Sequence, residues 1–146
     1  MDMERLLETE THSITELSQL KTAAAAFAER VKAGDVVCLS GDLGAGKTTF
    51  TQLLLQACGV KEPVKSPTYT LYETYNTEGK HFVHMDLYRL TDPEELYFLG
   101  IEDLINGNNI VLVEWPQKGF GVMPEADWTL KFSFKKLNRT LTITSE

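Results

Sequence analysis

Hydrophobic residues recur at intervals of three or four along two stretches of the chain, the spacing that places them on one face of an α-helix. The first stretch ends before Gly34 and contains Ile14, Leu17, Leu20, Ala24, Phe27 and Val31. Ser13 and Glu16 stand at its start with the spacing of a capping box. The second precedes Gly59, which suits a left-handed C-cap, and contains Phe50, Leu53, Leu54 and Ala57. The pattern predicts two amphipathic helices.

Two short apolar runs without polar alternation indicate strands that are buried on both faces of a parallel sheet. Residues 36–39 lie between Asp35 and Gly41, and residues 110–113 end at Glu114. A glycine-rich loop and the second predicted helix follow the first run. The order helix, strand, loop, helix predicts an α/β fold with a mostly parallel central sheet flanked by helices.

Two further pairs of segments have the composition and alternation of antiparallel hairpins, which would be additions to that sheet. They are residues 70–75 and 82–86, separated by a polar stretch at 78–80, and residues 128–134 and 137–144, separated by Lys135 and Lys136. Between the hairpins, Asp92 as N-cap and Pro93 at the first helical position predict a short helix to about Leu99. Gly100 would end it, and a helical turn is expected near residues 103–105.

The composition is that of a packed globular protein, and its length suits one domain over residues 1–146. Fourteen Lys and Arg against 21 Asp and Glu give a formal charge of −7, which argues against a broad grip on nucleic acid. Cys38 and Cys58 lack metal-ligand spacing, and no apolar run is long enough for a membrane span. With an acidic N-terminal stretch in place of an export signal, we expect a cytoplasmic protein with reduced thiols.

The loop between the first predicted strand and the second helix matches G-x-x-x-x-G-K-[ST], the P-loop of nucleotide triphosphatases. Its residues are Gly41, Asp42, Leu43, Gly44, Ala45, Gly46, Lys47 and Thr48. Glycines let backbone N–H groups converge on phosphate oxygens at a helix N-terminus, while the lysine reaches the β- and γ-phosphates and the hydroxyl binds magnesium. The sequence predicts a site for a nucleoside triphosphate and Mg²⁺ in a P-loop NTPase-like fold.

Magnesium also needs a carboxylate at the end of a neighbouring strand. Glu114 directly follows the apolar run 110–113 and is the first candidate. Asp86 ends the strand of the first hairpin and is the second candidate, although an ion pair with Arg89 on a surface turn would also account for it. The division of labour between these two acids stays open.

Other residues near these motifs give weaker signals. Thr68, after Ser66 and Pro67, stands where nucleotide switches place a threonine that senses the γ-phosphate, but a proline turn entering a strand explains it equally well. Trp115 is either a core aromatic or an exposed platform beside the nucleotide or a partner. The three histidines, His12, His81 and His84, lack ligand spacing and are interpreted as ordinary turn or strand residues.

Motifs that are absent from the sequence narrow the possible classes of P-loop protein. No N-K-x-D or D-x-x-G motif is present, which favours adenine over guanine. Only four arginines are available, and little chain remains for the lid of a small-molecule kinase. An ATPase that drives a conformational or assembly step and a nucleotide-gated binding module remain, with a small-molecule P-loop kinase as the less favoured alternative.

Four motifs in one order make the chain resemble the TsaE family, formerly YjeE. They are residues 41–49, Ser66-Pro67-Thr68-Tyr69, residues 84–90 (HMDLYRL) and Val113-Glu114-Trp115. The resemblance implies a bacterial ATPase required to form threonylcarbamoyladenosine next to the anticodon of ANN-decoding tRNAs. It also implies that the ATPase docks on the transferase subunit TsaD and its paralogue TsaB, meets tRNA only indirectly, and resets that complex by hydrolysis.

The resemblance assigns roles to positions of this sequence. Lys47 and the backbone of Gly41 to Thr49 would hold the phosphates of ATP, with Thr48 and Glu114 on Mg²⁺. Asp86 would orient water or the shell of the magnesium ion, and Thr68 would belong to the switch region. An adenine pocket is expected between the N-terminal stretch near Thr11 and the C-terminal hairpin near Arg139.

Overall fold

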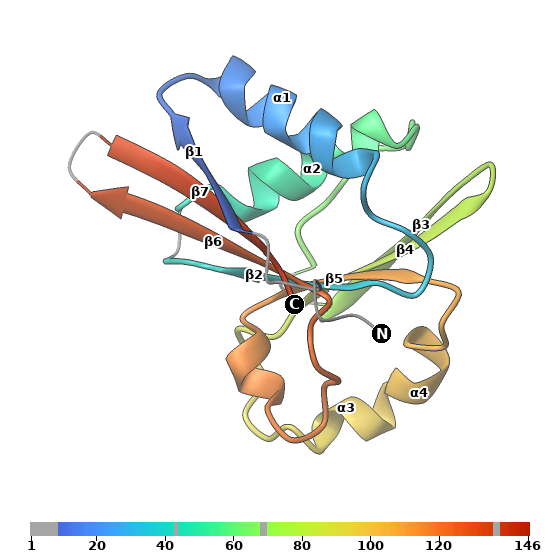
Figure 1. Cartoon of the computed structure of the whole chain (residues 1–146). Coiled ribbons are helices and arrows are strands. Elements are labelled where there is room, and N and C mark those ends of the chain that lie inside the picture. The colour runs from blue at the N-terminus through green and yellow to red at the C-terminus, as the bar shows by residue number, and fades with distance from the viewer. Residues whose placement is uncertain (1–8, 43, 68–69, 136–137) are drawn as a thin grey trace, which may run out of the picture.

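A seven-stranded mixed sheet forms the centre of the protein (Figure 1). The computed structural model describes residues 9–42, 44–67, 70–135 and 138–146. The strands are β1 (Thr9–Ile14), β2 (Val36–Ser40), β3 (Tyr72–Thr77), β4 (Lys80–Asp86), β5 (Ile110–Glu114), β6 (Trp128–Lys135) and β7 (Asn138–Ser145), in the spatial order β1-β7-β6-β2-β5-β4-β3. The central strands β6, β2, β5 and β4 are parallel. At the sides, β7 pairs antiparallel with β6, β1 with β7, and β3 with β4. The predicted α/β class is confirmed.

Helices cover the two faces of the sheet unequally (Figure 1). On one face lie α1 (Leu17–Ala28) and α2 (Lys47–Ala57), which pack against each other. On the other face lie three four-residue elements: α3 (Glu95–Phe98), α4 (Ile101–Leu104) and the 3₁₀ helix η1 (Pro116–Gly119). No helix in the described part of the chain combines the length and apolarity that crossing a membrane requires.

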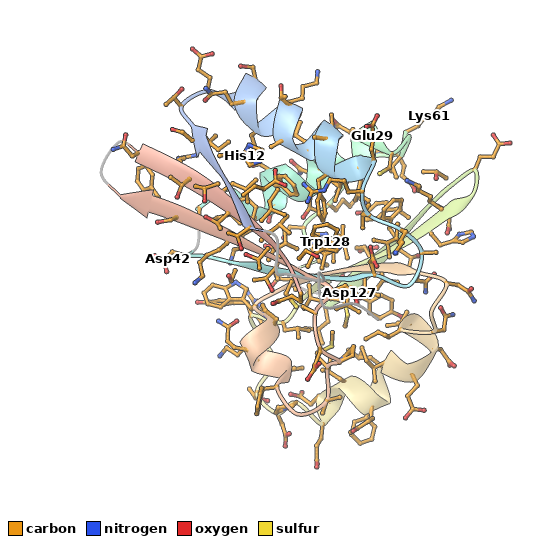
Figure 2. The ribbon with its side chains drawn as sticks, in the orientation of Figure 1. His12, Glu29, Asp42, Lys61, Asp127 and Trp128 are labelled. Carbon is orange, nitrogen blue, oxygen red and sulfur yellow. The ribbon has the colours of Figure 1, made fainter. Side chains whose placement is uncertain are left out.

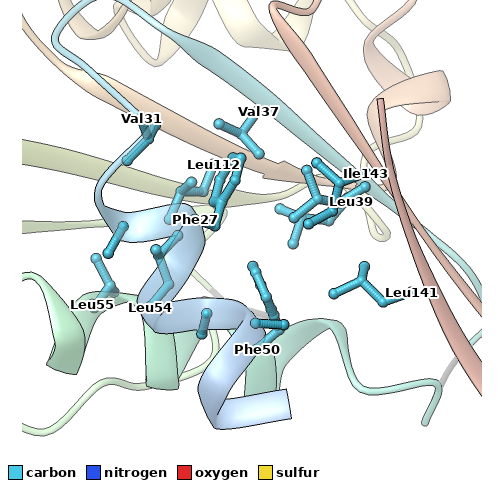
Figure 3. Close-up of a cluster of buried hydrophobic side chains, with 14 of the residues drawn as sticks. Phe27, Val31, Val37, Leu39, Phe50, Leu54, Leu55, Leu112, Leu141 and Ile143 are labelled. Atoms are coloured by element: carbon cyan, nitrogen blue, oxygen red, sulfur yellow. The ribbon is translucent and has the colours of Figure 1, made fainter. Parts of the chain in front are cut away.

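The larger hydrophobic core fills the space between α1, α2 and the sheet (Figure 3). Its helical side chains include Phe27 and Phe50, whose rings lie 6.2 Å apart between centroids. From β2, Val37 and Leu39 point into this core, while Val36 belongs to the smaller core on the opposite face. This alternation buries both faces of β2 and explains its continuous apolar sequence.

The predicted start of the first helix is wrong. Ser13 and Ile14 belong to β1, which the sequence analysis missed, and α1 begins at Leu17. The capping box is formed by Glu16 and Gln19. Residues 9–14 alternate in exposure because they pair with β7, a strand far away in sequence, and that tertiary pairing outweighs the local helical spacing.

The other predicted elements are found with shifted ends. Both hairpins form, although the first begins at Tyr72 and its second strand already at Lys80. At the helix expected from Asp92, the Asp92 carboxylate accepts the Glu94 N–H and the Glu95 carboxylate accepts the Asp92 N–H, as predicted for an N-cap. The first backbone bonds there span only three residues, so the α-helix itself begins at Glu95. The helical turn expected near 103–105 is α4, and η1 was not predicted.

Candidate functional site

The carboxyl ends of three parallel strands bring the predicted site residues to one edge of the sheet. In the strand register, Glu114 lies beside Leu39 of β2 on one side and beside Asp86 of β4 on the other. Helix α2 begins at the same edge. A pocket of about 230 Å³ lies here, lined by Gly44, Gly46, Lys47, Thr48, Thr49, Ser66, Asp86, Glu114, Trp115 and Arg139.

The loop from Gly41 to Gly46 connects β2 to α2 through backbone conformations that favour glycine. Gly46, the N-cap of α2, has φ 111°. Gly41 has φ 143°, and a Cβ atom there would lie 2.6 Å from the backbone oxygen of Phe132. The Asp42 carbonyl accepts the Ala45 N–H at 3.0 Å, which closes a turn, and Leu43 lies outside the described residues. The loop therefore delivers the N-terminus of α2, with its unpaired N–H groups, to the pocket.

Lys47 lies between this loop and the acidic side chains. Its Nζ donates to the Gly41 carbonyl at 2.6 Å and lies 4.1 Å from the centroid of the Trp115 ring. Burial lowers the pKa of Lys47, while the nearby charges of Glu114, Asp86 and Asp42 oppose that shift. A lysine in this place supplies positive charge to an anion bound at the start of α2.

Trp115 adopts a strained backbone conformation beside the pocket. Its φ of 57° and ψ of 51° lie in the left-handed region, which is uncommon for a bulky residue. The ring contacts Tyr88 with centroids 5.0 Å apart and covers the Lys47 ammonium. Both predicted alternatives have support, because the ring lines the pocket and also packs against the smaller hydrophobic core.

Glu114 and Asp86 provide buried carboxylates next to the Thr48 hydroxyl. Thr48 Oγ1 lies 3.3 Å from both carboxylate oxygens of Glu114. Asp86 is 8% exposed, and its Oδ1 accepts the Tyr88 N–H at 3.0 Å. Burial raises the pKa of Asp86, and the charge of Glu114 adds to this shift, while the Tyr88 N–H, His84 and Lys47 oppose it. Asp86 is thus part of the pocket and not of a surface turn.

These oxygen donors fit a magnesium ion that shares its coordination with phosphate and water. Within the described ranges, no three His, Cys, Asp or Glu side chains are grouped so that they could hold a metal by themselves. Mg²⁺ bound with a nucleotide needs only one or two carboxylates and a hydroxyl from the protein. The Thr48 hydroxyl and the adjacent Glu114 carboxylate have the required hard-oxygen chemistry.

His84 lies in β4, as predicted for a strand histidine, but its ring also bonds to a candidate metal ligand, which the sequence analysis did not predict. Its side chain is fully buried, and Nε2 lies 2.7 Å from Oε2 of Glu114. The sequence contained a usable signal, because positions 84 and 86 share one face of a strand and Asp86 was already a candidate. His12 and His81 contact Glu10 and Asn76 instead, away from the pocket.

A second hollow of about 260 Å³ adjoins the first one. Gly46, Thr49 and Arg139 line both, and the second is completed by Ile14, Thr15, Glu16, Leu17 and Leu20. The structure therefore brings Arg139 next to the P-loop. It does not bring Thr11 there, since Thr11 faces Thr142 across β1 and β7, with hydroxyl oxygens 3.3 Å apart, and lines a separate hollow beside α1.

The segment expected to act as a switch reaches the pocket through Ser66. Thr68 lies outside the described residues. On either side of it, the Pro67 carbonyl accepts the Leu71 N–H, and the Leu71 carbonyl accepts the Asp86 N–H, both at 2.9 Å. Leu71 thus links the Pro67 backbone to one of the two carboxylate residues.

Comparisons with known proteins agree with one another. The family model described as "Threonylcarbamoyl adenosine biosynthesis protein TsaE" matches residues 14–141. A Haemophilus influenzae "tRNA threonylcarbamoyladenosine biosynthesis protein TsaE" is 60% identical over 92 residues, which are 63% of this chain but only 58% of that protein. The Rickettsia typhi protein of the same name is 40% identical over 107 residues, 73% of this chain and 74% of the relative. The crystal structure of Bacillus subtilis YdiB is similar with a TM-score of 0.80 and 28% identity, covering 97% of this chain and 88% of the other.

Proposed function

The chain belongs to the TsaE family, and from this premise we propose that it is a cytoplasmic ATPase that acts with TsaD and TsaB in forming threonylcarbamoyladenosine on tRNA. The family match and the names of the relatives support the pathway. Hydrolysis would reset the transferase complex between rounds. The chain would contact tRNA only indirectly, in keeping with its net charge of −7.

The observation that carries the ATPase proposal is the contact between the Thr48 hydroxyl and the Glu114 carboxylate at the start of α2. Thr48 and Glu114 would hold Mg²⁺, with Asp86 near enough to orient a water molecule. A magnesium ion held there would supply positive charge that offsets the charge developing on the phosphate oxygens. Lys47 would leave the Gly41 carbonyl and donate to the phosphates, which the backbone N–H groups of the loop would also hold.

The hollow beside Arg139 is the proposed adenine site. It adjoins the phosphate pocket through Gly46 and Thr49, and it is walled by the start of α1 and the end of β1. Leu20 offers apolar surface and Arg139 a planar cation, both of which suit a purine ring. Because Thr11 lies outside this hollow, we no longer include it among the proposed adenine contacts.

The isolated chain would turn over slowly and a partner surface would complete its site. In the part of the chain that the structure describes, the cationic side chains lining the phosphate pocket are Lys47 and Arg139. Arg139 also borders the proposed adenine hollow, where it is proposed to contact the base. Phosphoryl transfer gains greatly from an additional arginine supplied by a partner, and TsaD or TsaB would provide that stabilisation.

The test is steady-state ATP turnover with and without the purified TsaB–TsaD heterodimer. Wild type and Lys61→Ala should be stimulated, whereas Lys47→Ala should not. Lys61 is an apt control because it is exposed and lies beyond the opposite end of α2 from Asp42 and the loop (Figure 2). Equal ATP turnover with and without the heterodimer would contradict the role of the partners and favour a small-molecule kinase. Nucleotide affinity without turnover under either condition would favour a nucleotide-gated binding module.

A further inference from the structure

The buried ring of His84 makes one hydrogen bond, and that bond is to Glu114. The ring is 0% exposed, and Nε2 lies 2.7 Å from Glu114 Oε2. Nδ1 is also buried and has no hydrogen-bonding partner among the described residues. Because an ionised carboxylate only accepts hydrogen bonds, Nε2 is the ring nitrogen whose N–H can donate to Glu114. Among the described residues, the hydrogen bond to Glu114 Oε2 is thus the only one that the His84 ring makes.

This bond makes the two oxygens of Glu114 unequal. Oε2 receives the His84 N–H and lies 3.3 Å from the Thr48 hydroxyl, whereas Oε1 has the same 3.3 Å contact with Thr48 and no bond to the ring. A carboxylate at the end of a strand can otherwise rotate about its terminal torsion, which has only broad preferences. The donor on Oε2 fixes that rotation and leaves Oε1 available on the side of Thr48.

We propose that His84 is a positioning residue, which holds the Glu114 carboxylate so that Oε1 and the Thr48 hydroxyl together face the divalent cation of the bound nucleotide. The inference rests on the proposed function, since it assigns a role within that nucleotide site. It adds a residue that has no metal-ligand spacing in the sequence. His84 does not touch the nucleotide, so its effect passes entirely through Glu114. Residues that orient a metal ligand in this way commonly change metal affinity 10- to 100-fold.

The alternative is that His84 only fills space between β4 and the helices. Substitutions that differ in where they place an N–H group separate the two roles. In His84→Gln, the side-chain amide nitrogen falls close to the position of Nε2 and can still donate to Oε2. In His84→Asn, the shorter side chain puts its amide near the position of Nδ1, out of reach of Glu114. Both replacements are polar, but asparagine is the smaller, so a pure packing role predicts a larger loss for asparagine that also appears in ADP affinity in EDTA and in thermal stability.

The measurement is the affinity of Mn²⁺ for the complex of the full chain with ADP, followed by the electron paramagnetic resonance signal of free Mn²⁺. We expect His84→Asn to weaken Mn²⁺ binding 10- to 100-fold and His84→Gln to stay within about threefold of wild type. ADP affinity in EDTA should change by less than about threefold in both variants, since no metal is then involved. His81→Asn is the matched control, because His81 is an exposed histidine of the same strand that bonds to Asn76, and it should match wild type.

Equal Mn²⁺ affinity in wild type and His84→Asn would overturn the inference. So would an equal loss in His84→Gln and His84→Asn, or a parallel fall of ADP affinity in EDTA, which indicates lost packing. Failure of the proposed function has a different signature, because wild type itself would then bind no ADP with or without the metal. Thermal unfolding of each variant shows whether a change in binding follows from a change in folding.

Discussion

Two regions meet at the same strand ends but are held in place by different means. The loop from Gly41 to Gly46 is held by its backbone, whose positive φ angles of 143° and 111° at these two residues favour glycine. The acidic region at the ends of β4 and β5 is held by buried side chains. His84, Asp86 and Glu114 there are 0%, 8% and 3% exposed. One region depends on the absence of side chains and the other on their burial.

The difference separates the effects of mutation. A side chain added at Gly41 must displace the Phe132 backbone, so the fold itself is destabilised. The Asp86 carboxyl, in contrast, is held where burial disfavours its charge, and its raised pKa is the sign of that cost. Removing this carboxylate should therefore impair the site while stabilising the protein, as is common where function requires an unfavourable group.

The largest effect is expected where the two regions face each other, at Lys47. Lys47→Met removes the ammonium but keeps an unbranched apolar chain over the Trp115 ring. We expect ATP turnover to fall about 1,000-fold, near 4 kcal/mol of transition-state stabilisation. Thermal stability should not decrease, because burial already disfavours the charged lysine. Turnover within tenfold of wild type would show that Lys47 does not serve the phosphates.

The next effect concerns the loop and is measured by urea unfolding. In Gly41→Ala, the new Cβ would lie 2.6 Å from the Phe132 oxygen at a φ that alanine rarely adopts. We expect a loss of about 2–4 kcal/mol in the free energy of unfolding. Gly44→Ala is the matched control, since Gly44 has φ 80° but nothing within 4 Å, and it should cost only about 1 kcal/mol. Equal losses of stability in the two variants would show that the close approach of Gly41 to the Phe132 backbone does not matter.

The sequence predicted the parts of this comparison that depend on local signals. The P-loop motif and the apolar runs on either side of it are contiguous, so the loop, β2 and α2 could be recognised together. Glu114 could be placed because parallel strands deliver their carboxyl ends to one edge, and β5 is indeed parallel to β2.

Features that depend on distant pairing could not be predicted in the same way. Strand β1 forms because it pairs with β7, and residues 9–14 contain no local signal for that distant partner. The role of His84 requires that β4 lies beside β5, because only that neighbour places the ring against Glu114. Thr11 and Arg139 were expected to share a pocket. Arg139 lines the hollow next to the P-loop, whereas Thr11, on the strand that pairs with β7, lines a separate hollow beside α1.

A smaller effect with opposite signs in function and stability is expected for Asp86→Asn. The amide keeps an acceptor for the Tyr88 N–H but removes the buried charge. We expect a gain of about 1 kcal/mol in the free energy of unfolding at pH 7, and at least tenfold slower turnover. Since folding raises the pKa of Asp86, the folded state binds more protons than the unfolded state just above pH 3.8.

Relative to Asp86→Asn, wild type should therefore lose stability as the pH rises from 3.8 through the folded-state pKa. Below pH 3.8, the free energies of unfolding of the two proteins should converge. Urea unfolding at a series of pH values measures this difference. Asp103→Asn, at an exposed acid of α4, is the control and should track wild type throughout. A stability gain of the same size in Asp103→Asn would attribute the effect to net charge and not to burial.

The smallest effect is expected at Thr48, the residue through which the loop region contacts the acidic region. If only the hydroxyl matters there, Thr48→Ser should keep ATP turnover within about threefold of wild type, because serine also serves at this position of the motif. Thr48→Val keeps the branched shape and loses the oxygen that lies 3.3 Å from Glu114. Mn²⁺ affinity for the ADP complex and turnover should then fall together in the valine variant alone. If serine and valine were equally impaired, packing of the Thr48 methyl group, and not its oxygen, would join the two regions.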